Sequence, residues 1–163
     1  MEKPEVLLPC QIHCIPHIAQ PANPADKITH IYSRVKRFLK RRTIYLRNRL
    51  AEKSQRLTDK PNPPLQVGER VRIRSKAEIQ STLDHWNSLK GCTFLEEMWP
   101  YCDTNQRVLK RMERFLDERD YRLKRTSGSV LLEGVICNGT VDFGKCDRSC
   151  FFFWREEWLE RLD

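Results

Sequence analysis

The chain has 163 residues, 39% of them hydrophobic, which is enough for one modest core, and its formal net charge is +8. No run of about 18 apolar residues occurs, so we expect no membrane-spanning helix, and the N-terminus lacks the basic and apolar segments of an export signal. We therefore expect a cytoplasmic protein whose seven cysteines are metal ligands or buried thiols rather than a disulfide framework.

Charge is distributed unevenly along the chain. Residues 1–65 carry 13 lysines and arginines against five acidic residues, whereas residues 66–163 carry 17 of each sign. The two parts meet at a stiff, proline-rich linker over residues 61–65, which cannot continue a helix. Because the net charge belongs to the first part, the sequence predicts a basic helix attached to a neutral domain.

The first 22 residues form a leader that we expect to be poorly ordered. It contains four side chains that can ligate a metal, namely Cys10, His13, Cys14 and His17. Prolines within this stretch argue against one regular helix, and the spacing matches no common zinc module. We interpret these residues as incidental to a tail.

A long basic amphipathic helix is predicted over residues 23–60. Asn23 is suited to the N-cap, and Pro24 to the first helical position. Apolar residues then recur at steps of three and four, as on one helix face, with an interruption at Arg42. They are Ile28, Ile31, Val35, Leu39, Leu46 and Leu50.

The other faces of this helix are rich in basic residues, and we take six of them as candidate anion-binding residues. They are Arg34, Lys36, Arg37, Lys40, Arg41 and Arg47. Such a helix can lie along nucleic-acid phosphates, rest on an anionic membrane surface, or dock on an acidic protein. It can also pack its apolar stripe on the rest of the protein and leave its charges in water.

The domain of residues 66–163 opens with a predicted half-buried strand. Its residues alternate, with Val67, Val71 and Ile73 on the inner face. The outer face carries a second candidate anion-binding set, consisting of Arg70, Arg72 and Arg74.

Short elements are predicted after this strand. Ser75 and Glu78 form a capping box that opens a helix with Ile79, Leu83 and Trp86 facing inward. A second capping signature runs from Thr93 to Glu96, and residues 108–116 fit either a helix or a bulged strand. Turns are predicted at 117–120 and 127–128, followed by a buried strand over 129–137 and a hairpin turn at 138–139. Apolar residues over 154–162 recur at helical spacing. Short strands with compact turns favour a small, strongly curved barrel. The fold class is therefore mainly β with flanking helices.

Four cysteines of this domain form a candidate structural zinc site, because soft thiolates in a closed tetrahedral set are what structural zinc prefers. The ligands would be Cys102, Cys137, Cys146 and Cys150. Buried free thiols, disulfides or a redox pair are the alternatives, and iron is the alternative metal. The aromatic run that follows Cys150 is interpreted as core beside the metal. Two pairs of neighbouring acids, Glu96-Glu97 and Glu156-Glu157, are expected on solvated helix faces.

Residues 67–162 resemble a group of small bacterial proteins of unassigned role. The shared features are a Gly-x-x-Val-x-Val-x-Ser-x-x-Glu-Ile run beginning at Gly68, Glu-Met-x-x-Tyr-Cys ending at Cys102, Leu-Glu-Gly-Val-x-Cys ending at Cys137, and a closing Cys-x-Arg-x-Cys-x-x-Phe-Trp-Arg-Glu beginning at Cys146. The resemblance implies an SH3-like small barrel with the cysteines as a unit, and a loose association with natural-product and polysaccharide biosynthesis. Asp103 stands where the group is expected to have a glycine.

These observations favour a non-catalytic, metal-stabilised adaptor that recruits a protein or nucleic-acid partner. A nucleic-acid-binding regulator is one alternative. An enzyme, or an accessory subunit of a biosynthetic pathway, that uses a reactive cysteine is another, and Cys92 with His85 is the one pairing in the domain to propose for it. Glycine-rich phosphate loops, His-Glu-x-x-His and nucleophile elbows are absent from the sequence.

Overall fold

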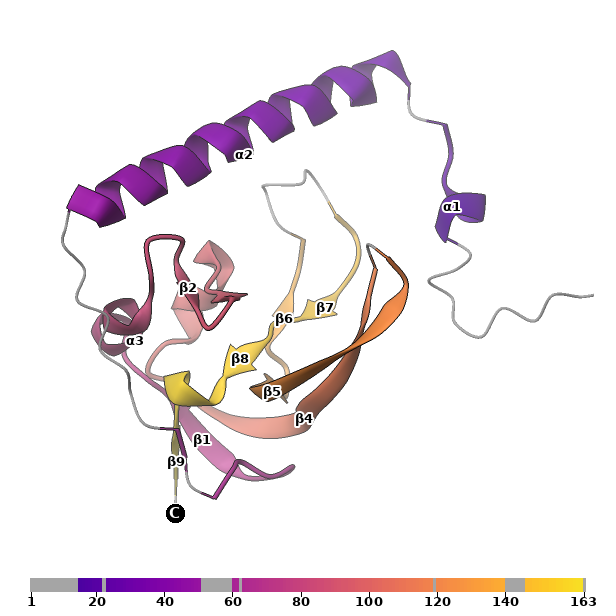
Figure 1. Cartoon of the computed structure of the whole chain (residues 1–163). Coiled ribbons are helices and arrows are strands. Elements are labelled where there is room, and N and C mark those ends of the chain that lie inside the picture. The colour runs from indigo at the N-terminus through magenta and orange to yellow at the C-terminus, as the bar shows by residue number, and fades with distance from the viewer. Residues whose placement is uncertain are drawn as a thin grey trace, which may run out of the picture.

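The computed structural model combines a long N-terminal helix with a curved β domain (Figure 1). It describes residues 15–21, 23–50, 60–61, 63–118, 120–139 and 146–162. The N-terminal part contains the short helix α1, Ile15–Ile18, and the long helix α2, Pro24–Leu50. Asn23 precedes α2 as predicted, and its carbonyl accepts the first helical hydrogen bond from the Lys27 N–H at 3.2 Å. The predicted continuation over 51–59 lies outside the described residues.

The β domain follows the linker and consists of short strands and helical turns around one pair of long strands. In chain order the elements are β1 (Arg70–Ile73), α3 (Lys76–Thr82), β2 (Ser88–Leu89), β3 (Cys92–Thr93), η2 (Glu96–Tyr101), β4 (Asn105–Asp117), β5 (Arg122–Leu132), β6 (Ile136–Cys137), β7 (Cys150–Phe151), β8 (Trp154–Arg155), η3 (Glu156–Trp158) and β9 (Leu159–Arg161). The capping box of Ser75 and Glu78 opens α3 as predicted.

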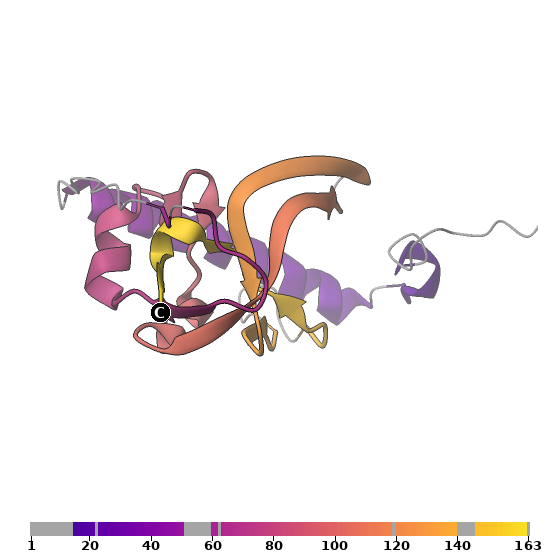
Figure 2. The same ribbon diagram turned by 90° about the horizontal axis from the view of Figure 1, so that it is seen from below.

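Five of these strands form one antiparallel sheet in the order β8-β5-β4-β1-β9. Its edge strands β8 and β9 are joined by the three residues of η3, so Arg155 and Leu159 lie at most about 14 Å apart. In a flat sheet of five strands the edges would be about 19 Å apart. The sheet must therefore curl, and Figure 2 shows the bent ribbon that β4 and β5 form. Within the described residues β8 and β9 share no ladder, so the sheet is curved and open rather than a closed barrel.

The ambiguous stretch 108–116 is a bulged strand, because β4 shifts register against β5 near Val108 and again near Met112. The turn predicted at Ser127 and Gly128 is wrong, since β5 runs through both residues. Gly128 kinks the strand with a φ of +66°, and a Cβ there would lie 3.0 Å from the Arg155 guanidinium. The buried strand predicted over 129–137 ends instead at Leu132.

The core lies inside the curl and is built on two tryptophans. Trp154 and Trp158 are fully buried and meet Phe94 edge to face, with ring centroids 5.7 and 5.1 Å apart. The helical period predicted around them is wrong, because β8, η3 and β9 occupy these residues. Two inward predictions were also wrong. Val67 is exposed because β1 begins only at Arg70, and Trp86 is half exposed because it lies outside the core, against Tyr45 of α2.

The acid pair of η3 is buried rather than solvated, contrary to the prediction. Glu157 is 1% exposed, and its carboxylate accepts hydrogen bonds from the Nε and Nη2 atoms of Arg155, each at 3.1 Å, and from Lys90 Nζ at 2.7 Å. Burial opposes the charge of Glu157, but the hydrogen bonds from Arg155 and Lys90 outweigh it and hold the pKa of Glu157 below its ordinary value. Glu156 is also buried, 3.7 Å from Arg111 Nη1. This charged cluster fixes η3 between the sheet edges.

Candidate functional site

Helix α2 rests on the β domain through residues near its C-terminal end. The Tyr45 ring lies against Trp86 with centroids 4.8 Å apart, and the guanidinium of Arg41 lies 5.7 Å from the Trp86 ring centroid. Asn48 is buried, and its side-chain amide donates to the carbonyl oxygen of His85 at 3.2 Å and to Asn87 Oδ1 at 3.0 Å. These contacts hold one side of the helix against the loop that follows α3 (Figure 1).

The apolar stripe of α2 faces away from this contact and is exposed. Each of its large side chains is between 45% exposed, at Leu46, and 84% exposed, at Leu50. The apolar stripe consists of Ile28, Ile31, Tyr32, Val35, Phe38, Leu39, Leu46 and Leu50. Tyr32 and Phe38 were missed in the sequence, although both fall on the same face at a period of 3.6 residues. The stripe therefore does not pack on the described part of the domain.

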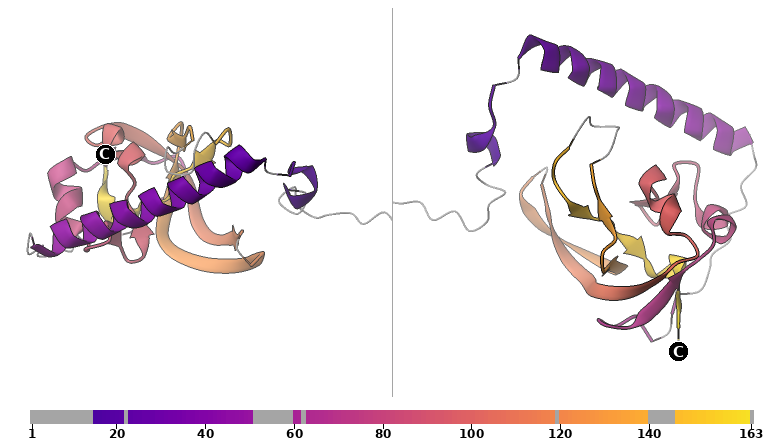
Figure 3. Two further views of the ribbon diagram at one scale, coloured as in Figure 1. Left: turned by 90° about the horizontal axis from the view of Figure 1, so that it is seen from above. Right: turned by 180° about the vertical axis from the view of Figure 1, so that it is seen from behind.

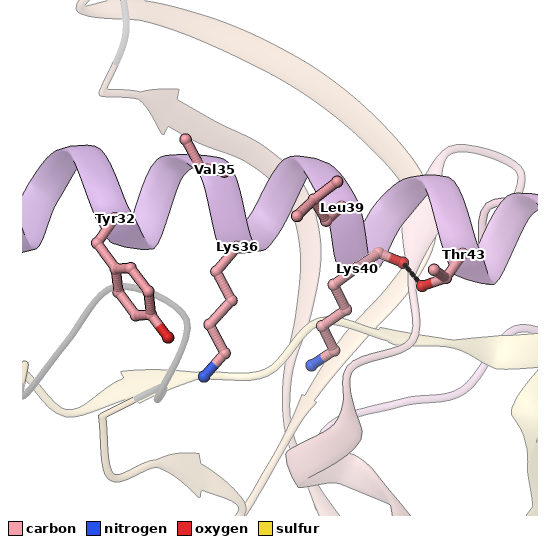
Figure 4. A pocket seen from close by; sticks show the side chains of 6 residues that line it. All are labelled: Tyr32, Val35, Lys36, Leu39, Lys40 and Thr43. Atoms are coloured by element: carbon pink, nitrogen blue, oxygen red, sulfur yellow. Dashed lines mark hydrogen bonds between the residues drawn. The ribbon is translucent and has the colours of Figure 1, made fainter.

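Basic side chains border the apolar stripe. Figure 4 shows Lys36 and Lys40 extending beside Tyr32, where side chains of α2 line a shallow hollow of about 400 Å³. All of its lining residues belong to this one helix, namely Tyr32, Val35, Lys36, Leu39, Lys40 and Thr43. Of the six basic residues predicted on α2, Arg34, Lys36, Arg41 and Arg47 are exposed, while Arg37 and Lys40 are half-buried. Because one helix supplies this whole lining, the hollow is part of the open surface of α2.

The second candidate anion-binding set is partly engaged within the domain. Arg72 donates to Glu160 Oε2 from Nε at 2.9 Å and from Nη2 at 2.7 Å, and it pairs with Asp103 at 3.1 Å. The hydrogen bond to Glu160 raises the pKa of the Arg72 guanidinium, although burial opposes this. Arg74 donates to the carbonyl oxygen of Glu157, whereas Arg70 is exposed. Strand β1 therefore offers less unpaired positive charge than its sequence suggests.

The four cysteines of the predicted zinc site are only partly brought together. Cys137 and Cys150 are direct partners in the β6–β7 ladder, while Cys146 is exposed just before β7 and Cys102 packs against the core at the end of η2. Burial, and next the nearby Asp103, raise the pKa of the Cys102 thiol. No group of three or more metal-binding side chains is assembled among the residues that the structure describes. The ladder pair supplies two thiols, which is half of a tetrahedral zinc site.

Two other features noted in the sequence are the residue after Cys102 and the cysteines and histidines of the leader. Asp103, which stands at the expected glycine, adopts a φ of 62°, a conformation that favours glycine. The leader residues Cys10, His13 and Cys14 lie outside the described residues, as does the side chain of His17. The prediction that they are incidental stays a prediction.

Cys92 lacks the setting of a nucleophile. Burial raises the pKa of its thiol to about 11, so the thiol is protonated at neutral pH. Its Sγ donates to the carbonyl oxygen of Phe153 at 3.4 Å, whereas the His85 ring faces Tyr45 at a centroid distance of 6.1 Å. Cys92 and His85 therefore contact different neighbours and do not form the pairing that the sequence suggested.

Comparison of the chain with protein families, with curated proteins and with solved structures finds no match. Among the described helices, none combines the length and the apolar character that crossing a bilayer requires.

Proposed function

We propose that this chain is a non-catalytic binding protein, an adaptor that recruits an anionic partner through α2. The observation that carries the proposal is that net positive charge and exposed apolar surface coincide on one helix. Nine lysines and arginines stand against one aspartate within Pro24–Leu50. An apolar face of this size on a folded protein typically marks an interaction site.

The β domain has the role of a scaffold in this proposal. Its acids and bases are largely paired with one another, as in the pairs of Arg72 with Glu160, Arg155 with Glu157 and Arg161 with Glu69. We propose that the curled sheet is a partly open, SH3-like small barrel, because its edge strands share no ladder but are joined through three residues. We further propose that the four cysteines hold a structural zinc ion, an idea that the thiol pair of the β6–β7 ladder supports.

The proposal is tested by measuring the affinity of the full chain for three anionic probes at about 50 mM salt, where charge is weakly screened. The probes are a 20-base-pair DNA duplex, poly-L-glutamate, and vesicles containing phosphatidylglycerol. The test variant is Lys36→Glu with Arg47→Glu, since both side chains are exposed on α2. We expect at least one probe to bind, and its affinity to fall by about tenfold or more in the variant.

A matched control reverses two charges outside the helix. Lys110→Glu with Arg114→Glu changes the net charge equally on exposed positions of β4. An equal loss in both double variants would mean that binding follows overall charge rather than α2, and the proposal would be wrong. Failure of all three probes to bind would also refute it.

A nucleic-acid-binding regulator is the alternative, and salt distinguishes it. Binding through phosphates alone would weaken steeply as salt rises and would leave the apolar stripe in water. Insensitivity of DNA binding to changes in the stripe, with no binding to the other two probes, would favour the regulator.

A further inference from the structure

We infer that the partner of α2 is an anionic lipid surface, on which the helix lies lengthwise with its apolar stripe among the acyl chains. This inference rests on the proposed function, because it names the class of partner that α2 would recruit. Three features of the helix carry it: the arrangement of basic residues around the stripe, the position of the β domain, and the sign of the helix charge.

Basic residues border the apolar stripe on both sides. At about 100° per residue, the stripe covers an arc of roughly 120°, which Arg42 and Arg49 interrupt. Lys36 and Arg47 follow one border of this arc, and Lys27 and Arg34 follow the other. All four side chains are exposed. Long basic side chains in these positions extend to lipid phosphates while their alkyl stems cover apolar surface, which is the pattern of a helix lying in a membrane interface.

The β domain leaves the stripe open to a flat surface. Asn48 contacts the domain from the side of α2 opposite to Leu39, and Tyr45 contacts it from a position about 80° around the helix from Val35. Figure 3 shows α2 running along the outside of the domain over its whole length. A planar partner can therefore meet all of the roughly five turns between Ile28 and Leu46 without displacing the domain.

The other partners fit these observations less well. A second copy would bring together two helices that each carry nine basic residues and one acid, and the two would repel each other. A nucleic acid would engage the cations but leave eight large apolar side chains in water. An acidic protein groove would suit the charge, but the convex stripe lies open along its length and is bordered by cations on both sides. A lipid surface satisfies the stripe and both borders together.

The experiment is flotation of the full chain with vesicles at about 0.1 M salt, where surface charges more than about 10 Å apart are screened. Vesicles of phosphatidylcholine with phosphatidylglycerol are compared with vesicles of phosphatidylcholine alone. The stripe variant Ile31→Gln, Val35→Gln, Phe38→Gln keeps the net charge and uses a good helix former, so circular dichroism should show unchanged helix content. We expect the wild type to bind the anionic vesicles, and the stripe variant to bind them at least about tenfold more weakly.

A matched control removes exposed apolar side chains elsewhere. Val67→Gln with Leu123→Gln alters two exposed positions of the β domain and should leave vesicle binding unchanged. The stripe variant should also keep any binding to poly-L-glutamate or DNA, which depends on its charges.

The outcomes separate this inference from the proposed function. Binding to poly-L-glutamate without binding to vesicles would overturn the lipid surface and leave the adaptor in place, whereas binding to DNA alone would overturn the lipid surface and favour the regulator. Equal binding to neutral and anionic vesicles, or full vesicle binding by the stripe variant, would overturn the inference as well. A chain that binds none of the probes would overturn both.

Discussion

Replacing Arg155 by methionine should destabilise the β domain severely, because Arg155 neutralises a buried carboxylate. Its guanidinium donates twice to Glu157 at 3.1 Å and once to the carbonyl oxygen of Ser127 at 2.9 Å, and the side chain is 8% exposed. Methionine would keep most of the stem but remove the charge, leaving Lys90 as the remaining cation that the structure shows on Glu157. Removing one partner of a buried ion pair costs about 3–5 kcal/mol.

We take the lower end of this range, about 3 kcal/mol, because Lys90 remains. For a domain of about 100 residues this lowers the Tm by about 12 °C or more. Urea unfolding followed by the fluorescence of the buried Trp154 and Trp158 measures the change. The control is the double variant Arg155→Met, Glu157→Met, in which no buried charge of this pair is left alone. We expect it to be more stable than Arg155→Met.

The reasoning fails in either of two cases. A cost below about 1 kcal/mol for Arg155→Met would mean that the pair contributes no more than an exposed ion pair does. A double variant that loses the sum of the two single losses would mean that the two side chains act independently, contrary to their bidentate geometry.

Three further predictions concern acid, metal and the seating of α2. The pKa of Glu157 lies below its ordinary value of 4.5, so the stability that its ionisation contributes is complete above pH 4.5. This stability is lost as the pH falls from 4.5 through the lower pKa of the folded state. Glu157→Gln should therefore flatten the decline of stability with pH in acid unfolding curves. Elemental analysis should find about one zinc per chain, and Cys137→Ser should lose the zinc and lower the Tm; absence of metal from the wild type, or an unchanged Tm in the variant, would refute the four-cysteine site. Trp86→Ala should speed amide hydrogen exchange in α2 and spare β4, because Trp86 provides the ring against which Tyr45 packs.

Local signals in the sequence predict the parts of the fold that depend on neighbours in the chain. The N-cap at Asn23 and the capping box of Ser75 and Glu78 are satisfied within one helical turn, so their chemistry is readable directly. The buried strand residues Val71 and Ile73 follow from alternation in the same way. These features need no knowledge of the tertiary structure.

The environment of η3 could not be read in this way. In the sequence, Glu156 and Glu157 look like solvated acids, because the cations beside them, Arg111 and Lys90, come from distant parts of the chain. The same limit applies to the aromatic run from the end of β7 to the start of β8, in which Phe151 and Phe153 are exposed while Phe152 and Trp154 are buried. The sequence interpretation placed Phe151 and Phe153 in the core, and that was wrong.

The direction in which the apolar stripe faces also lies beyond the sequence. Amphipathic spacing indicates that one face of α2 prefers burial, but it does not say against what. The contacts of Asn48 and Tyr45 determine which way the stripe faces, because they place a different side of the helix against the β domain. The cysteines give a similar result, since register pairs Cys137 with Cys150, whereas the sequence grouped four residues.

The coincidence of charge and apolar surface on α2 supports a division of labour between the two parts of the chain. Within the β domain, acids and bases are equal in number, and the buried Glu156 and Glu157 have cations of the same domain beside them. Helix α2 holds both the unbalanced charge and, among the described residues, the longest exposed apolar face. Fully burying one such side chain contributes about 1.5–3 kcal/mol, so a partner that covers several of them can offset the cost of ordering the helix and association. Charge would then govern the encounter with an anionic partner, and the apolar stripe would govern its lifetime.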